Sequence, residues 1–195
     1  MNTKKQTATQ HLFTNKQLRT LLVPIMVEQL LSSLMGTADT MMVSNVGSAA
    51  ISAVSLVDAI NILVIQALSA LAAGGAILCS QYLGSQNLKK AKRSAEQVLF
   101  VMLVLSCSLS LLCLIFRFPL LRLIFGTVDT DVMANSQIYF FFTLLSFPFI
   151  GLYDAGASIL RAQNNTKGPM TISILSNFLN IGGNAILIFV FGMGV

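Results

Sequence analysis

The sequence predicts an all-α integral membrane protein, a polytopic bundle of about five transmembrane helices. Hydrophobic residues make up 55% of the 195 residues and charged residues only 10%, whereas a soluble protein has about 25% charged residues. Long apolar segments alternate with short polar ones, and most basic residues lie in the polar segments. So few charges do not cover the surface of a soluble domain, and lipid is the solvent that suits the excess apolar surface.

Polar residues 1–17 predict a short cytoplasmic tail. After it, five apolar segments predict membrane spans at residues 18–43, 49–82, 95–116, 136–160 and 170–191. The third span is the clearest, because residues 98–116 contain 19 uncharged residues, close to the ~20 that cross the hydrocarbon core. The remaining residues predict loops, among them a basic loop around residues 89–93 and a polar turn at residues 161–169.

The distribution of basic residues predicts that the N-terminus lies in the cytoplasm. We expect a multi-pass protein of the plasma membrane. With that orientation, ten basic residues face the cytoplasm and two, Arg117 and Arg122, face outside. The ten are Lys4, Lys5, Lys16, Arg19, Lys89, Lys90, Lys92, Arg93, Arg161 and Lys167. Cytoplasmic loops carry an excess of Lys and Arg, so the opposite orientation is disfavoured.

Several classes of function have no support in the sequence. The basic residues form no continuous face, which argues against nucleic acid as a partner. The cysteines Cys79, Cys107 and Cys113 lie inside apolar segments without metal-ligand spacing, and His11 is the only histidine. With no phosphate-binding loop, nucleophile triad or metal cluster, we expect neither an enzyme nor a bound cofactor.

The first span carries a polar stripe that includes two carboxylates. Glu28, Ser32, Gly36 and Asp39 recur at i, i+4, i+8 and i+11, which places them on one helical face. A carboxylate within a span costs about 2.5–3.5 kcal/mol on insertion scales and marks a functional candidate. For Asp39 we favour a function. The alternatives are a structural interhelical hydrogen bond and an interfacial position near the outer turn. Glu28 is more ambiguous.

The fifth span carries a matching stripe. Ser173, Asn177, Asn180 and Asn184 step by four, three and four residues, so they share one face. These side chains need hydrogen-bond partners in the membrane. Two interpretations remain open: the asparagines join helices together, or their carbonyl oxygens bind a hard cation.

The other polar residues near the spans give weaker signals. Asp58 and Asp154 lie near predicted span ends, where water can reach them. Tyr82, Tyr139 and Tyr153 are also near span ends and predict interfacial anchors in a chain without tryptophan.

Four ordered motifs resemble the multidrug and toxic compound extrusion (MATE) family, and together they extend over nearly the whole chain after the tail. They are Pro24 with Asp39-Thr40-Met41-Met42-Val43 and Val46-Gly47, then Ser80-Gln81-Tyr82-Leu83-Gly84, then Leu160 through Met170, and Asn177 through Asn184 to Phe189.

The resemblance implies which residues act in coupling. Asp39 matches the first-helix carboxylate that is protonated or binds the coupling ion, and Pro24 matches a proline at which that helix bends. Asn180 and Asn184 match two positions of the family's ion site, so the resemblance implies a possible Na⁺ site at these three residues. Many members carry Asp at the position of Asn184, so one negative charge is missing here.

The resemblance also implies the architecture and the activity. Complete members have two six-helix lobes and export drug-like, often cationic compounds in exchange for H⁺ or Na⁺. The chain resembles part of the N-terminal lobe. The sixth helix and the C-terminal lobe are expected outside it, and we expect no transport by this chain alone. The alternatives are a lipid-linked saccharide flippase of the wider superfamily and a non-transporting membrane subunit.

Overall fold

The structure is a computed structural model that describes residues 14–44 and 47–186. The described residues form six helices and no strand. The helices are α1 (Asn15–Ser44), α2 (Ser48–Gly84), α3 (Leu88–Ile115), α4 (Arg117–Phe125), α5 (Thr130–Ala162) and α6 (Lys167–Ala185).

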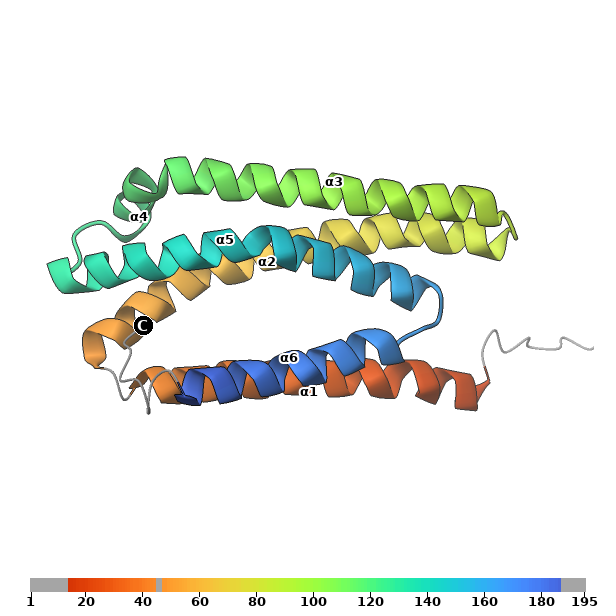
Figure 1. Cartoon of the computed structure of the whole chain (residues 1–195), viewed down its shortest axis with the longest axis horizontal. Helices are drawn as coiled ribbons and strands as arrows, with labels where there is room; N and C mark the ends of the chain where they lie inside the picture. The colour runs from red at the N-terminus through yellow and green to blue at the C-terminus, as the bar shows by residue number, and fades with distance from the viewer. Residues whose placement is uncertain (1–13, 45–46, 187–195) are drawn as a thin grey trace, which may run out of the picture.

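The helices form two layers (Figure 1). The first layer contains α2, α3 and α5, with the short α4 at one end. The second layer is the pair α1 and α6. The hydrophobic core lies within the first layer, around Val57 and Leu68 of α2, Met102 of α3, and Phe140 and Phe147 of α5. The α1–α6 pair therefore lies outside this core.

Small side chains let the helices of the first layer approach each other closely. A Cβ atom at Gly75 of α2 would lie 2.5 Å from Val98 of α3. A Cβ atom at Gly151 of α5 would lie 2.8 Å from Ser106 of α3. Ser110 also donates to the carbonyl oxygen of Leu144 at 2.6 Å. Close backbone approach and interhelical hydrogen bonds are what hold helices together where lipid removes the hydrophobic driving force.

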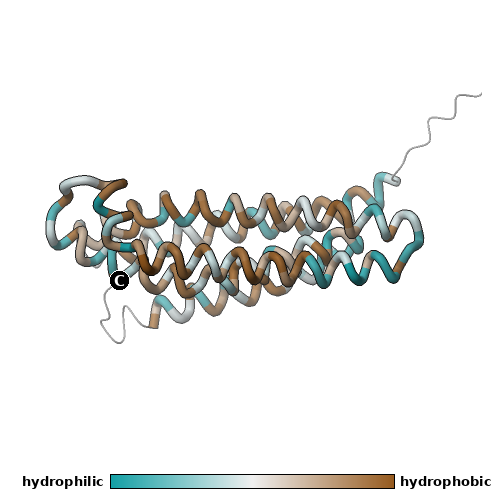
Figure 2. The backbone as a smooth tube through the Cα atoms, turned by 90° about the horizontal axis from the view of Figure 1, so that it is seen from above, coloured by the Kyte–Doolittle hydropathy of each residue, from teal (hydrophilic) through white to brown (hydrophobic). Residues whose placement is uncertain are grey.

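The outer surface of the bundle is apolar. Large side chains that point away from the core include Leu63 (71% exposed), Leu123 (85%) and Phe178 (74%). Figure 2 shows that hydrophobic residues dominate the middle of the helices, whereas hydrophilic residues gather towards the two ends. Such a surface suits lipid rather than water. The predicted class, an all-α membrane bundle, is confirmed.

Four of the described helices, α1, α2, α3 and α5, are long and apolar enough to cross a membrane. The predicted fifth span corresponds to α6, which is not among these four. This helix begins at Lys167, and residues 187–191 of the predicted span lie outside the described residues. It runs beside α1 (Figure 1).

Two predicted loops prove to be helical, and one is shorter than predicted. The basic residues 89–93 lie in the first turns of α3, where Asn87 caps the helix by accepting from the backbone N–H of Lys90 at 3.1 Å. Residues 117–125 form α4 instead of a loop. Arg161 belongs to the last turn of α5 rather than to the following turn. Hydropathy detects only the apolar part of a helix, so a helix that extends beyond the hydrocarbon core is underestimated.

One end of the bundle collects most of the basic residues, and we call it the basic end. The start of α1, the α2–α3 turn and the α5–α6 turn meet there (Figure 1). Its basic residues are Lys16, Arg19, Lys89, Lys90, Lys92, Arg93, Arg161 and Lys167. This arrangement agrees with the pattern behind the predicted orientation. The cytoplasmic location of that end remains a prediction.

Candidate functional site

Two carboxylates on α1 define the candidate site. Glu28 and Asp39 are 11 residues apart, which corresponds to about 16 Å along a helix. Glu28 is nearer the basic end and is 6% exposed, whereas Asp39 is half-buried. Their surroundings differ in charge.

Asp39 faces α6 and contacts amide groups. The Nδ2 atom of Asn184 donates to Oδ1 of Asp39 at 2.9 Å and also to Oδ1 of Asn180 at 3.3 Å. Among the described residues, no cationic side chain lies within salt-bridge distance of Asp39. The structure therefore brings together the three residues that the family resemblance assigns to an ion site. Their role remains a prediction.

The atoms around Asp39 are suited to a hard cation or a proton. One carboxylate and two amide carbonyl oxygens are the ligand types that alkali and other hard cations prefer. In the described part of the chain, no three His, Cys, Asp or Glu side chains lie close enough together to hold a metal ion. The oxygen atoms at Asp39 suit hard cations, whereas soft metals prefer thiolate ligands.

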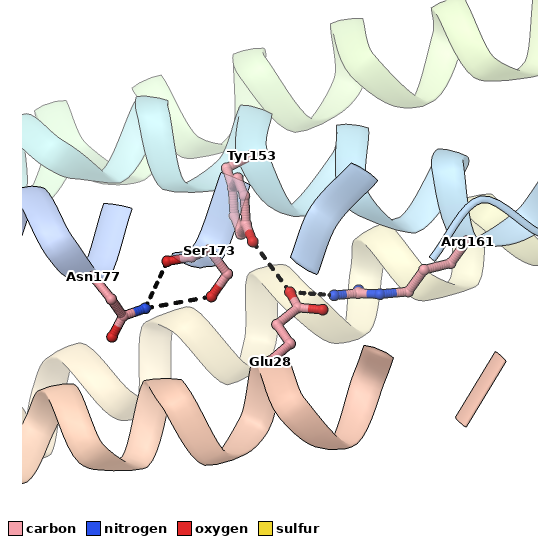
Figure 3. Close-up of polar contacts among 5 residues, drawn as sticks. All are labelled: Glu28, Tyr153, Arg161, Ser173 and Asn177. Carbon is pink, nitrogen blue, oxygen red and sulfur yellow. Dashed lines mark hydrogen bonds and ion pairs between the residues drawn. The ribbon is translucent and has the colours of Figure 1, made fainter. Parts of the chain in front are cut away.

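Asn177 does not belong to this group. Its Nδ2 atom donates to the carbonyl oxygen of Ser173 at 2.7 Å and lies 3.4 Å from the hydroxyl of the same residue (Figure 3). Both residues are buried. These bonds lie within α6. The hydrogen bonds found for Asn177 in the described residues therefore connect it neither to another helix nor to the amides at Asp39. The predicted stripe therefore separates into an intrahelical pair and a pair that faces α1.

Glu28 is neutralised by an ion pair. The Nη2 atom of Arg161 lies 2.7 Å from Oε1 of Glu28, and the Tyr153 hydroxyl donates to the same oxygen at 3.1 Å (Figure 3). Both partners come from α5. These contacts favour a structural role in joining α1 to α5. The coupling role suggested by the sequence remains untested.

Pro24 is buried within α1, which continues through it without interruption. Proline has no N–H, so the carbonyl four residues earlier, at Thr20, loses its helical partner. The hydroxyl of Thr166, in the α5–α6 turn, donates to that oxygen at 3.3 Å. A side chain from the adjacent turn thus satisfies the carbonyl that the proline frees.

The remaining members of the α1 stripe are exposed. Ser32 and Gly36 are exposed, so no helix of the described residues covers them. Gly36 instead lines an open groove of about 560 Å³ on α1, together with Ser33, Thr37, Thr40, Met41 and Ser44. Our interpretation of the sequence missed this hydroxyl-bearing face, although its spacing of four, three and four residues was visible.

Two further contacts were also missed. Tyr153 and Tyr139 were expected to anchor the membrane interface, but both hydroxyls donate to carboxylates inside the bundle. Tyr139 donates to Asp58 at 3.1 Å and Tyr153 to Glu28. No local signal announces such pairs, because the partners are 81 and 125 residues apart.

Comparison with known proteins identifies the family of this chain. The sequence model of the MatE family matches residues 24–186. The uncharacterised transporter YisQ of Bacillus subtilis is 32% identical over 88% of this chain. The probable multidrug resistance protein NorM of Thermotoga maritima is 26% identical over 85% of it. The chain spans 38% and 35% of the length of these two relatives.

Solved structures share the fold. A MOP superfamily transporter from Pyrococcus furiosus superposes with a TM-score of 0.85 at 24% identity, over 92% of this chain and 39% of that one. A MATE transporter in complex with MaD3S gives a TM-score of 0.86 at 23% identity, over 92% and 40% of the two chains. The match to the family's sequence model extends over most of the chain and includes both carboxylates of α1, and on this basis the chain belongs to the MatE family of MATE transporters.

Proposed function

We propose that the protein acts as a secondary active antiporter that exports drug-like, often cationic compounds in exchange for H⁺ or Na⁺. In this proposal Asp39 is the coupling carboxylate. The observation that carries it is the contact between Asp39 and Asn184 across the α1–α6 interface, with no counter-charge beside it in the described residues.

The chemistry follows from that missing counter-charge. An ionised carboxylate within a membrane helix is costly, by about 2.5–3.5 kcal/mol on insertion scales. A hydrogen bond to a charged acceptor contributes about 1.5–3 kcal/mol, so the amide of Asn184 offsets part of this cost. The remainder favours binding of a proton, a metal cation or a cationic substrate. Because all three compete for one carboxylate, binding of one displaces another.

The amides allow the site to bind either coupling ion. Asn180 and Asn184 supply neutral carbonyl oxygens and no negative charge of their own. A site with one negative charge is neutralised by a single monovalent cation. We therefore propose that one H⁺ or one Na⁺ enters each time the Asp39 carboxylate is neutralised. The membrane potential contributes about 2.3 kcal/mol per charge per 100 mV to that entry. Export of a substrate with one positive charge costs the same amount, so the concentration gradient of the coupling ion drives that exchange.

Export requires that α1 changes its packing when Asp39 is neutralised. The exposed hydroxyl face of α1 consists of Ser33, Thr37, Thr40 and Ser44. These residues flank Asp39 in sequence and line the open groove. We propose that this face contacts substrate in the complete transporter, which contains a second lobe. Two bodies that move against each other around one site are what alternating access needs.

The alternative substrates are anionic. One relative, the FAD transporter of Shewanella oneidensis, is 28% identical over 80% of this chain, and a lipid-linked saccharide also carries phosphate. An anionic substrate calls for an unpaired cation inside the bundle. The candidate in the described spans is Arg161, and Glu28 already neutralises it. A non-transporting subunit has no need for a carboxylate without a counter-charge.

The orientation is part of the proposal, with the basic end in the cytoplasm of a cell whose plasma membrane holds the protein. Ser48, the first residue of α2, and Ser85, which follows its last residue, are exposed and lie at opposite ends of the helix. In a chain without its three native cysteines, a membrane-impermeant thiol reagent should label a cysteine at position 48 from outside. A cysteine at position 85 should react only after the membrane is opened. The reverse pattern contradicts the orientation.

Transport by the complete two-lobe protein tests the function itself. Vesicles that contain it should move a fluorescent cationic dye when a pH or Na⁺ gradient is imposed. Asp39→Asn keeps the hydrogen bond to Asn184 and removes the charge, so gradient-driven movement should fall to background. Asp131→Asn, which removes an exposed carboxylate in the first turn of α5, is the matched control and should retain transport. Near-normal transport by Asp39→Asn contradicts the role of this residue.

A further inference from the structure

A second group of oxygen atoms lies in the first layer, away from the contacts of Asp39. Asp58 of α2 accepts from the Nδ2 atom of Asn61 at 3.2 Å and from the Tyr139 hydroxyl of α5 at 3.1 Å, both at its Oδ1 atom. Asp58 has no cationic partner within salt-bridge distance among the described residues. This cluster plays no part in the antiport mechanism described above.

The amide of Asn61 carries the observation that points to a ligand. Its side chain is only 8% exposed, and its Oδ1 atom has no hydrogen-bond partner in the part of the chain that the structure describes. Rotating the amide does not remove the problem, because it would place the carbonyl oxygen against the Asp58 carboxylate, and two acceptors repel. The bond to Asp58 therefore fixes the orientation of the amide, and its Oδ1 atom is left as the unpartnered atom.

A buried carbonyl oxygen without a partner is rare and unfavourable, because the oxygen loses its bond to water and gains nothing in exchange. What such an oxygen lacks is a donor or a cation. The cluster also contains the carboxylate of Asp58 and the phenolic oxygen of Tyr139, which still has lone pairs after its proton is donated. Three oxygen atoms from two helices, with one negative charge in total, are a suitable ligand set for a hard monovalent cation.

We propose that Asp58, Asn61 and Tyr139 form a second cation site that binds Na⁺ or an ion of the same class. The ligands are the carboxylate of Asp58, the carbonyl oxygen of Asn61 and the hydroxyl oxygen of Tyr139. The single carboxylate matches a monovalent rather than a divalent ion. The site is built on α2 and α5 and shares no ligand with Asp39, so it stands independently of the proposed antiport.

The position of the site gives it a consequence for Asp39. Two carboxylates in one helical bundle repel each other, and among the described residues neither Asp39 nor Asp58 has a cation within salt-bridge distance. A cation held at Asp58 weakens that repulsion. Binding of a cation at the second site therefore lowers the cost of ionising Asp39. Through this electrostatic effect, the first layer influences the α1–α6 pair.

Sodium binding to the purified chain in detergent tests the proposal. The measurement is made in an Asp39→Asn background, so that the site on α1 and α6 is silent. Na⁺ replaces choline at constant ionic strength, and bound radioactive sodium is counted. Tyrosine fluorescence gives a second readout, because the chain has three tyrosines and no tryptophan. We expect saturable binding of sodium and a change in tyrosine emission.

Three further substitutions in that background locate the site. Asp58→Asn should weaken sodium binding at least tenfold, and Asn61→Leu, which keeps the side-chain size, should do the same. Tyr139→Phe should remove the change in emission. Circular dichroism with thermal melting identifies variants that fold, and Asn61→Leu should melt at a higher temperature than its parent without sodium because it removes the unpartnered oxygen.

The outcomes separate this site from the proposed antiport. If the folded Asp39→Asn chain binds no sodium while Asp58→Asn alone binds it normally, only the Asp39 site exists and the second site is refuted. Equal binding by the Asp39→Asn chain with and without Asp58→Asn also refutes it. Tetraphenylphosphonium is tested in the same way. If it changes the tyrosine emission, if Asp58→Asn abolishes that change and if sodium has no effect, the cluster binds organic cations and the sodium assignment is wrong.

Discussion

Glu28 and Asp39 are both acidic residues on one helix, yet the structure gives them opposite surroundings. Glu28 is buried against the guanidinium of Arg161 and the hydroxyl of Tyr153. Asp39 is half-buried against the amide of Asn184, without a cation in reach among the described residues. The difference teaches that a carboxylate in a membrane helix is not functional by its presence alone. A neutralised carboxylate holds helices together, and one without a counter-charge is available to bind an ion.

The two halves of α1 are anchored to a different extent as well. Near the basic end, Glu28 bonds to two residues of α5 and Thr20 accepts from Thr166. Further along, Asp39 bonds to α6, and an adjacent face of the helix borders an open groove. We therefore expect the half around Glu28 to stay attached to α5, and the half around Asp39 to move when the carboxylate is neutralised.

The largest expected effect on stability comes from Arg161→Ala. It leaves the buried Glu28 carboxylate without its counter-charge, and removing one partner of a buried ion pair costs 3–5 kcal/mol. Arg161 is 32% exposed in its side chain, so we expect about 3 kcal/mol, measured as the free energy of unfolding in mixed micelles. The double variant Glu28→Gln with Arg161→Met should be more stable than Arg161→Ala alone. Additive losses would contradict the pairing.

An intermediate effect is expected from Asn184→Asp, which adds a second carboxylate beside Asp39. Two carboxylates attract a monovalent cation more strongly than one, and we expect about a tenfold gain in sodium affinity, or about 1.4 kcal/mol. Isothermal titration measures it. Asn177→Asp is the matched control on the same helix and should give no such gain. A gain in the control that equals the gain at position 184 would contradict the local geometry.

A smaller effect is expected from Thr166→Val. The substitution preserves shape and removes the hydroxyl that donates to the Thr20 carbonyl freed by Pro24. Leaving that oxygen without a partner should lower the free energy of unfolding by about 1 kcal/mol. In a Pro24→Ala background the helix supplies its own N–H to Thr20, so the same substitution should cost less. An equal cost in both backgrounds would show that the hydroxyl does not serve this carbonyl.

The smallest effect on stability is expected from Asp39→Asn, although its effect on transport is the largest. The substitution keeps an oxygen that accepts from Asn184 and relieves the half-buried charge. We expect a change in the free energy of unfolding within about 0.5 kcal/mol. A loss as large as that of Arg161→Ala would mean that Asp39, like Glu28, is mainly structural.

The helices were largely predictable from sequence because their apolar segments are long. The basic start of α3 is not apolar enough for hydropathy to detect, although Asn87 is a recognisable cap. Arg161 is predicted in a turn for the same reason, since a charge at the end of an apolar segment resembles the start of a loop. The nine residues of α4 are largely apolar but too few for a span.

The candidate site was predictable only in part. The spacing of polar residues placed Asp39 and the asparagines of α6 on single faces, and the family resemblance grouped them. Periodicity along one helix contains no information about which residue of another helix it meets. The partners of Glu28 and Asp58 therefore appeared only in the structure, where Arg161 and Glu28 are 133 residues apart in sequence.

Equilibrium binding of tetraphenylphosphonium to the complete two-lobe protein tests the contrast between the two carboxylates most directly. Affinity is measured while pH is lowered or Na⁺ is raised, for the unaltered protein, Glu28→Gln and Asp39→Asn. The account predicts that the coupling ion weakens binding in the unaltered protein and in Glu28→Gln, and that Asp39→Asn binds weakly with no dependence on that ion. Dependence that survives in Asp39→Asn and disappears in Glu28→Gln would contradict it.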